Sequence, residues 1–242
     1  MKWHLFECEE HPGKFNMQLD IDLARNCKPG EAFLRFYKWK PYCISIGANQ
    51  KFDDINIRLA GKNNLDVVKR PTGGRAILHA EELTYSVVLP NSLKLSNENI
   101  YNKISLALQK GLIKFNKIFS VIELEKLNPD LRENYKNPSG MLCFSSTAKH
   151  EIKFEGKKLV GSAQRRMEHS ILQHGSILTG SYHQNIVNYL NIEDDLKTEI
   201  RNDILRKTIE MDTILNSKTD YAKLIDSLIE GFSEVWQIDR FN

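Results

Sequence analysis

The sequence lacks the cysteine patterns that mark metal-binding or disulfide-linked proteins. None of its cysteines forms a Cys-x-x-Cys pair or has a histidine partner at zinc-finger spacing. This distribution favours neither a zinc site nor a disulfide framework, so we expect no bound metal. Unpaired thiols are typical of a reducing compartment, which predicts a cytoplasmic protein. The four thiols are those of Cys8, Cys27, Cys43 and Cys143.

Long apolar runs and a strong excess of one charge are also missing. The N-terminal residues 1–7 are interrupted by charge, and no apolar run approaches the length of a membrane span. The 34 basic and 31 acidic residues are interspersed and leave a net charge of +3. We therefore expect no membrane partner and no nucleic-acid partner, and at most a weak preference for acidic proteins.

The sequence has no internal repeat and no low-complexity linker. Its hydrophobic content of 41% and charged content of 27% are ordinary for a globular protein. A chain of 242 residues is long enough to bury a substantial core. We therefore expect residues 1–242 to form a single domain.

The hydrophobic pattern predicts both strands and helices. Between residues 99 and 119 the apolar positions recur with a period of 3.6, which predicts an amphipathic helix with Ser96 or Asn97 as its N-cap. Strands in the first part and the middle, with helices between and after them, predict an α+β fold with a mixed sheet. Further helices are expected at 15–26, 194–211 and 220–236, and strands at 32–37, 43–47, 66–69, 75–79 and 82–89.

Two adjacent glycines, Gly73 and Gly74, lie between Arg70 and Arg75. Glycines let backbone amides approach an anion or a carbonyl closely, and the arginines could add charged donors. The alternative is a hairpin turn that needs positive φ. A Walker loop is excluded, because the lysine and hydroxyl that should follow the glycines are missing.

A lysine, Lys158, stands three residues before a Gly-Ser-Ala segment that we expect to be a turn, and Cys143 lies fifteen residues upstream. A thiol becomes a good nucleophile as a thiolate, and a nearby ammonium lowers its pKa, so this pairing suggests acyl chemistry. The alternative is a plain hairpin with strands at 151–154 and 158–160, in which Lys158 is a solvated charge.

The order of these motifs resembles the lipoate-protein ligase and octanoyltransferase superfamily. Residues 70–79 with 82–87 are similar to its signature, and residues 158–164 to its lysine motif. The resemblance implies a biotin/lipoate protein ligase-like fold and a single catalytic domain. It is extended by similarity to the family's opening helix and strands at 15–20 and 35–50, and to its next strand at 172–178.

The segment 139–144 resembles the one that carries the nucleophilic cysteine in the octanoyltransferase branch related to lipoate-protein ligase A. The resemblance implies that Cys143 takes an octanoyl group from octanoyl-acyl carrier protein and passes it to a lysine of a lipoyl domain, such as glycine-cleavage H protein. Lys158 would lower the pKa of Cys143 and donate a hydrogen bond to the acyl carbonyl. Thioester exchange of this kind needs no ATP and no other cofactor.

The resemblance also implies a set of substrate-binding residues. His79 is expected to be structural or pocket-lining rather than a general base, because Ala80 stands where the family commonly has an aspartate, although Glu81 and Glu82 follow it. His174 is expected beside the acyl chain. The other three cysteines are expected to be buried small residues. The implied binding residues are Arg70, Thr72, Gly73, Gly74, His79, Gly161, Ser162 and Ala163.

Three other functions stay open at this stage. An ATP-dependent lipoate-protein ligase would use Arg70, the two glycines and Lys158 to hold an acyl-adenylate. Such ligases often have an added C-terminal domain, so a chain that ends about sixty residues after Leu178 favours the transferase. The other two are an octanoyl amidotransferase between lipoyl domains and a lipoyl-domain-binding protein without turnover, and the presence of Cys143 and Lys158 disfavours the latter.

Overall fold

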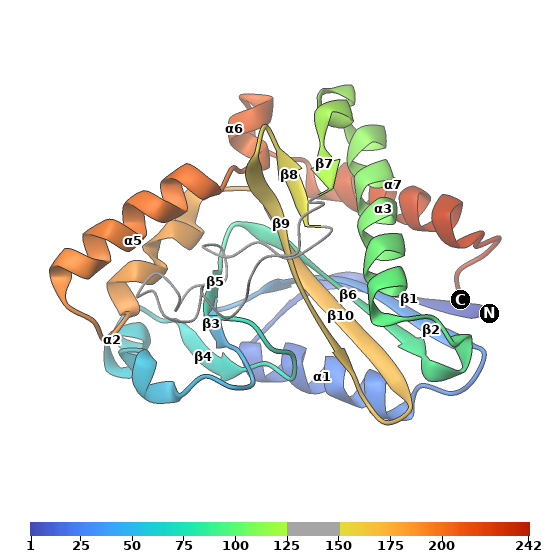
Figure 1. Ribbon diagram of the computed structural model, residues 1–242, viewed down its shortest axis with the longest axis horizontal. Coiled ribbons are helices and arrows are strands. Elements are labelled where there is room, and N and C mark those ends of the chain that lie inside the picture. The colour runs from blue at the N-terminus through green and yellow to red at the C-terminus, as the bar shows by residue number, and fades with distance from the viewer. Residues whose placement is uncertain (125–150) are drawn as a thin grey trace.

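Two β-sheets form the centre of the molecule, and helices pack around them (Figure 1). The computed structural model describes residues 1–124 and 151–242. The smaller sheet has the order β4 (Asp66–Lys69), β3 (Cys43–Ile46) and β5 (Ile77–His79). The larger sheet has the order β1 (Lys2–His11), β2 (Glu31–Trp39), β6 (Glu82–Pro90), β10 (Ser170–Leu178), β9 (Lys157–Arg166), β8 (Ile152–Phe154) and β7 (Glu123–Leu124).

Both sheets are mixed. β1 runs parallel to β2, and β4 runs parallel to β3. The other paired strands are antiparallel. The α+β class with a mixed sheet, expected from the sequence, is confirmed.

Helices cover both faces of the larger sheet. α3 (Asn97–Phe115) and α7 (Tyr221–Trp236) pack against each other on one face, and α1 (Gly13–Asn26) lies along the opposite one (Figure 1). The remaining helices are α2 (Ile57–Lys62), α5 (Asp194–Lys207) and α6 (Met211–Leu215), with 3-10 turns η1 (Phe52–Asp54), η2 (Asn91–Leu93), η3 (Lys117–Val121) and η6 (Ser181–Tyr189). In the described part of the chain, no helix is both long enough and apolar enough to cross a bilayer.

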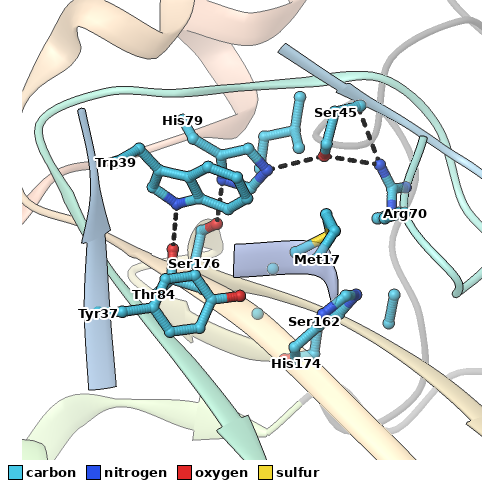
Figure 2. A pocket seen from close by; sticks show the side chains of 14 residues that line it. Met17, Tyr37, Trp39, Ser45, Arg70, His79, Thr84, Ser162, His174 and Ser176 are labelled. Atoms are coloured by element: carbon cyan, nitrogen blue, oxygen red, sulfur yellow. Dashed lines mark hydrogen bonds between the residues drawn. The ribbon is translucent and has the colours of Figure 1, made fainter. Parts of the chain in front are cut away.

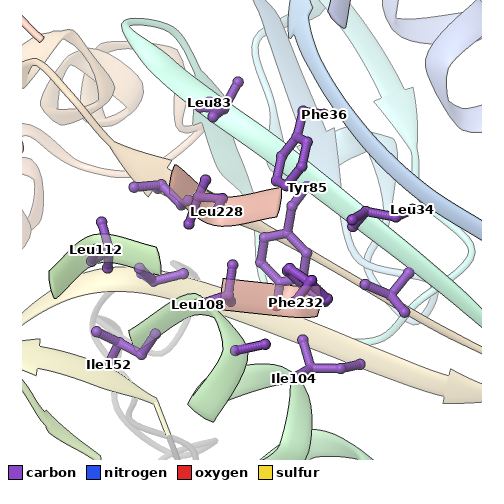
Figure 3. Close-up of a cluster of buried hydrophobic side chains, with 14 of the residues drawn as sticks. Leu34, Phe36, Leu83, Tyr85, Ile104, Leu108, Leu112, Ile152, Leu228 and Phe232 are labelled. Atoms are coloured by element: carbon purple, nitrogen blue, oxygen red, sulfur yellow. The ribbon is translucent and has the colours of Figure 1, made fainter. Parts of the chain in front are cut away.

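The two faces of the larger sheet differ in chemistry. Successive strand residues point to opposite faces, so along β6 the side chains of Leu83, Tyr85 and Val87 enter the apolar core beneath α3 and α7 (Figure 3). Glu82 and Thr84 point to the α1 side, where they are also buried. A charged or polar side chain is costly to bury without partners, so this second face calls for an explanation.

The helix predicted over 99–119 is α3, and it is capped by Ser96 as expected. It ends at Phe115, four residues earlier than the apolar pattern indicates. Asn116 ends it, because its side chain accepts a hydrogen bond from the Ile118 amide (3.0 Å) and starts the η3 turn. The helix predicted over 194–211 is also shorter, since the chain turns after α5 before α6 begins.

β1 is a strand that the sequence pattern did not predict. It lies at the edge of the larger sheet, and Trp3 is its one buried residue. An edge strand with little buried surface shows no regular alternation of apolar and polar residues. The two chain ends meet there, because Trp3 pairs with Phe241.

The loop that carries Gly73 and Gly74 is not a hairpin turn. β4 and β5 both pair with β3 and not with each other, so the loop crosses the end of β3. Gly74 does adopt a positive φ of 89°. The hairpin interpretation of this segment is therefore wrong. The positive φ that it expects is present, at Gly74.

Candidate active site

A pocket with mainly apolar walls lies between α1, the polar face of the larger sheet and the smaller sheet (Figure 2). The space left inside it is about 30 Å³. Segments far apart in the sequence converge here because the strand ends of both sheets meet α1. Its side chains come from α1 (Met17), β2 (Tyr37, Trp39), β3 (Ser45), β5 (Ile77, His79), β6 (Thr84), β9 (Ser162, Ala163) and β10 (His174, Ser176), with Arg70 beyond β4.

One wall of the pocket is a stacked pair of rings. The rings of Trp39 and His79 lie 4.1 Å apart at an interplanar angle of 16°. Trp39 Nε1 donates to Thr84 Oγ1 (2.7 Å), and His79 Nδ1 lies 2.8 Å from Glu82 Oε1. Glu82 therefore supplies the acidic partner for His79 that Ala80 cannot provide. Both rings are held in place, so this wall is rigid.

A second cavity, of about 260 Å³, also has Trp39 and His79 in its lining. Two ion pairs border it: Lys38 Nζ lies 2.6 Å from Glu10 Oε1, and Lys218 Nζ lies 2.9 Å from Asp212 Oδ2. Its lining combines these charged side chains with aromatic ones, so it suits an apolar chain less well than the first pocket does.

Arg70 holds the glycine loop by its backbone. Its guanidinium donates to the carbonyl oxygens of Ser45 (3.0 Å), Gly73 (3.0 Å) and Arg75 (2.6 Å). A planar fork of donors fits this arrangement of acceptors. The structure therefore places the predicted binding residue Arg70 in the pocket wall, where its charge also orders the loop.

The two loop glycines have different surroundings. A Cβ on Gly47 would lie 1.9 Å from the carbonyl oxygen of Gly74, so the loop and the end of β3 are in close contact. Gly74 is exposed and left-handed. A Cβ on Gly73 would meet no atom within 4 Å, and Gly73 has no positive φ. Gly74 thus needs a left-handed backbone, whereas the role expected of both glycines, a close approach of their backbone amides to a substrate, stays a prediction.

A buried polar network supports the pocket from the α1 side. Asp20 has no exposed surface, and its carboxylate contacts Arg35 Nη1 (2.5 Å), the Tyr37 hydroxyl (3.1 Å) and His174 Nδ1 (3.1 Å). His174 Nε2 lies 2.6 Å from Thr72 Oγ1. The predicted residue Thr72 is thus fully buried behind His174.

The network fixes the protonation of its two central groups. Burial alone would raise the pKa of Asp20, but the hydrogen bond from His174 and the charge of Arg35 outweigh it and lower that pKa. Burial lowers the pKa of His174 despite the opposing effect of Asp20. Both shifts favour a neutral His174 beside a charged Asp20. In that state Nδ1–H of His174 donates to the Asp20 carboxylate, and Nε2 accepts from the Thr72 hydroxyl.

The predicted turn at Gly161–Ala163 is instead part of the continuous strand β9, and all three residues line the pocket. β9 pairs with β10, where Gly175 faces Ser162. A Cβ on Gly175 would lie 2.4 Å from the carbonyl oxygen of Gly161. Small residues in this strand therefore serve close packing and pocket space rather than a change of chain direction.

Lys158 is buried and ion-paired, not a solvated charge. Its side chain is 1% exposed, and Nζ lies 2.9 Å from Glu151 Oε2, which is also buried. The hairpin of β8 and β9 that the sequence predicts is confirmed, with its turn at Glu155 and Gly156. Lys158 is not among the described residues that line the pocket. It lies on the same strand, three residues before Gly161.

Cys143 and its segment 139–144 lie outside the described residues. The other three cysteines are free thiols. Burial and the charge of Glu31 raise the pKa of Cys27 to about 11. Burial also raises the pKa of Cys43 and Cys8, although Cys8 is only half-buried. These three thiols are protonated near neutral pH, which makes them poor nucleophiles.

Three polar residues of the site were missed in the sequence. Asp20 lies on the buried side of α1. Arg35 and Tyr37 are buried within β2, most of whose buried residues are apolar. A polar residue at a position where the pattern demands an apolar one is the signal that could have identified them. Within the described ranges, no cluster of His, Cys, Asp or Glu side chains is placed to hold a metal ion.

Comparisons with known proteins confirm the resemblance. The family model for the lipoyl protein ligase A/B catalytic domain matches residues 12–233. The chain is 31% identical to octanoyltransferase LipM of Lysinibacillus sphaericus, covering 98% of this chain and 88% of that protein. It is 32% identical to octanoyltransferase LipM of Clostridioides difficile, with the same coverage.

Solved structures show the same fold. Lipoate-protein ligase A bound with ATP superposes with a TM-score of 0.76 at 22% identity, covering 100% of this chain and 89% of that one. The bi-partite lipoate protein ligase of Thermoplasma acidophilum gives a TM-score of 0.75 at 20% identity, covering 100% and 87%. The biotin/lipoate protein ligase-like fold expected from the motifs is therefore confirmed.

Proposed function

The chain belongs to the lipoyl protein ligase A/B catalytic family, and we propose that it is an octanoyltransferase of lipoate biosynthesis. The proposal takes octanoyl-acyl carrier protein as the donor and a lysine of a lipoyl domain, such as glycine-cleavage H protein, as the acceptor. The observation that carries it is the similarity to octanoyltransferases over 98% of the chain. The family match over residues 12–233 supports one catalytic domain.

The pocket has the properties that an acyl chain needs. Its walls are mainly apolar, and the polar groups around it are bonded to one another rather than pointing into it unpartnered. Ligand pockets typically combine an apolar lining with a few fixed polar groups. The eight-carbon chain would lie among Met17, Tyr37, Trp39 and Ile77.

The proposed reaction proceeds in two thioester steps. The thiolate of Cys143 attacks the carbonyl carbon of the octanoyl thioester, and the thiolate of the carrier leaves. The neutral amine of the acceptor lysine then attacks the carbonyl carbon of the Cys143 thioester. An amide bond forms, the C–S bond breaks, the Cys143 thiolate leaves, and the proton lost by the amine passes to solvent. Each leaving thiolate is a good leaving group, so no nucleotide is consumed.

Lys158 is the proposed partner of Cys143. An ammonium beside the sulfur favours the thiolate, and the same group can donate to the developing oxyanion. The buried position of Lys158 strengthens such interactions, because the local dielectric is low. Its ion pair with Glu151 fixes the direction of the side chain inside the protein.

Dependence on ATP tests the proposal. Purified protein is mixed with an unlipoylated lipoyl domain and given either octanoyl-acyl carrier protein alone or free octanoate with ATP and Mg²⁺. The proposal predicts octanoylation in the first mixture and none in the second. Octanoylation only with free acid and ATP would show a ligase. A third mixture contains an octanoylated lipoyl domain as the donor, and transfer in that mixture alone would show an amidotransferase.

A further inference from the structure

The acyl pocket is too small, as it stands, for the chain proposed to occupy it. Its free space of about 30 Å³ would hold roughly two water molecules. An apolar cavity that takes up benzene, with six carbons, has about 150 Å³. An eight-carbon chain can therefore enter only if side chains that line the pocket move.

Most of the polar and aromatic walls cannot move without breaking hydrogen bonds. Tyr37 is bonded to Asp20 and lies under the Arg35 guanidinium, which is 4.1 Å from its ring centre. Trp39 is bonded to Thr84, and His174 to two partners. Displacing any of these groups would leave a buried polar atom unpaired, which is costly.

The backbone of α1 is fixed as well. The side-chain nitrogen Nδ2 of Asn16 donates to the carbonyl oxygens of His11 (3.1 Å) and Lys38 (3.1 Å), which ties the helix to β1 and β2. At the start of the helix, a Cβ on Gly13 would lie 2.5 Å from the sulfur of Cys43, so the helix touches the smaller sheet there. A movement of the whole helix would break these contacts.

Met17 differs from its neighbours. It is 5% exposed, makes no hydrogen bond that would hold it, and points into the pocket (Figure 2). Methionine is unbranched and flexible, so it fills irregular gaps and changes rotamer at low cost. Met17 belongs to the same apolar cluster as Cys43, and the half-buried Val68 packs against this cluster. These residues offer the displaced side chain an apolar surface. Ile77, the other apolar candidate, is β-branched and stiff.

We propose that the Met17 side chain occupies the acyl site of the unloaded enzyme and is displaced by the incoming chain, so that residue 17 determines which chain lengths are accepted. This inference rests on the proposed function, because it takes the pocket to be the acyl site. A flexible side chain at this position fills most of the empty pocket and still admits a substrate.

Variants at position 17 test the proposal through binding and loading. Met17→Ala removes the displaceable atoms, so loading of ten- and twelve-carbon thioesters relative to octanoyl should rise by about tenfold or more. Met17→Ile keeps the bulk but restricts χ1 on a helix to essentially one rotamer, so octanoyl loading should fall by a similar factor.

Leu23→Ala is the matched control, because Leu23 lies on the same helix but packs against a different cluster. It should leave the chain-length profile unchanged. Binding of free fatty acids of six to twelve carbons gives a readout that needs no transfer, and it is followed by tryptophan fluorescence, to which the pocket residue Trp39 contributes. Folding of each variant is checked by thermal unfolding, and Met17→Val replaces Met17→Ile if the latter does not fold.

The outcomes separate the inference from the proposed function. If wild type takes no octanoyl group from the carrier, the proposed function fails. If wild type is loaded but Met17→Ala keeps the wild-type profile and the β-branched variant loads normally, residue 17 is a passive part of the wall and the inference is overturned.

Discussion

The two faces of the larger sheet are buried alike but built from different chemistry. On the α3 and α7 side, Leu34 and Tyr85 belong to one continuous apolar core. On the α1 side, Arg35 and Asp20 form a buried ion pair within a network that reaches the pocket. Apolar burial stabilises the fold, whereas a buried ion pair contributes little net stability and is retained where position matters. The comparison indicates that one face maintains the fold and the other positions the site.

Substitutions of neighbouring residues of β2 allow each face of the sheet to be perturbed separately. Arg35→Ala leaves the Asp20 carboxylate buried without its guanidinium, so the free energy of unfolding should fall by about 3–5 kcal/mol. Octanoyl loading should also be lost from the fraction that stays folded, because Tyr37 and His174 share the same carboxylate. Urea unfolding and thioester loading measure the two effects. Wild-type loading by the folded variant would refute the positioning role.

Leu34→Ala, one residue earlier, perturbs the other face. It removes a fully buried side chain from the apolar core, which should lower the free energy of unfolding by about 2–5 kcal/mol. Loading per folded molecule, measured at low temperature, should stay at the wild-type level. A loss of loading as large as that of Arg35→Ala would mean that the two faces are not functionally distinct.

A smaller difference, in the free energy of unfolding, is expected between variants of the two loop glycines. Gly74→Ala places a side chain on a left-handed residue and should cost about 1–2 kcal/mol of stability. Gly73→Ala meets open space and should change stability by less than about 0.5 kcal/mol. Thermal unfolding of the two variants side by side measures the difference. Equal destabilisation would show that the loop conformation differs from the one described.

The smallest expected effect concerns pH. The pKa of His174 is lowered in the folded protein from its usual value of 6.5, so below that value the unfolded state binds more protons. Stability should therefore fall as the pH drops from about 7.5 to about 5.5, and the fall should be less steep in His174→Gln. Urea titrations at each pH measure the slopes, and identical slopes would contradict a neutral, buried His174. The pKa of His183 is also lowered by burial, so His183→Gln should make the fall less steep as well.

The sequence predicts the elements whose residues repeat regularly. α3 follows from its apolar period, and β6 from its β-rich run. β1 could not be predicted because an exposed edge strand has no regular pattern. The small residues Gly161–Ala163 predict a turn, but such residues also occur where two strands approach closely, and only the pairing with β10 separates the two cases.

The site was predictable to a similar degree. The same pocket is lined by Arg70, His79 and Ser162, which the motifs predict to belong to one site. The partnership of His79 with Glu82 and of Lys158 with Glu151 depends on side-chain directions that no spacing rule gives. Asp20 and Arg35 lie fifteen residues apart in sequence, and their contact follows only from the packing of α1 on β2.

The thioester on Cys143 is the central claim, and intact-protein mass spectrometry tests it most directly. The protein is mixed with octanoyl-acyl carrier protein, without ATP and without acceptor, and the product is digested to locate the modified peptide. The raised pKa values of Cys8, Cys27 and Cys43 predict that these thiols stay unmodified. The account predicts one octanoyl group, on the peptide that contains Cys143, and none in Cys143→Ala. An adduct on another residue, or full transfer to a lipoyl domain by Cys143→Ala, would contradict it.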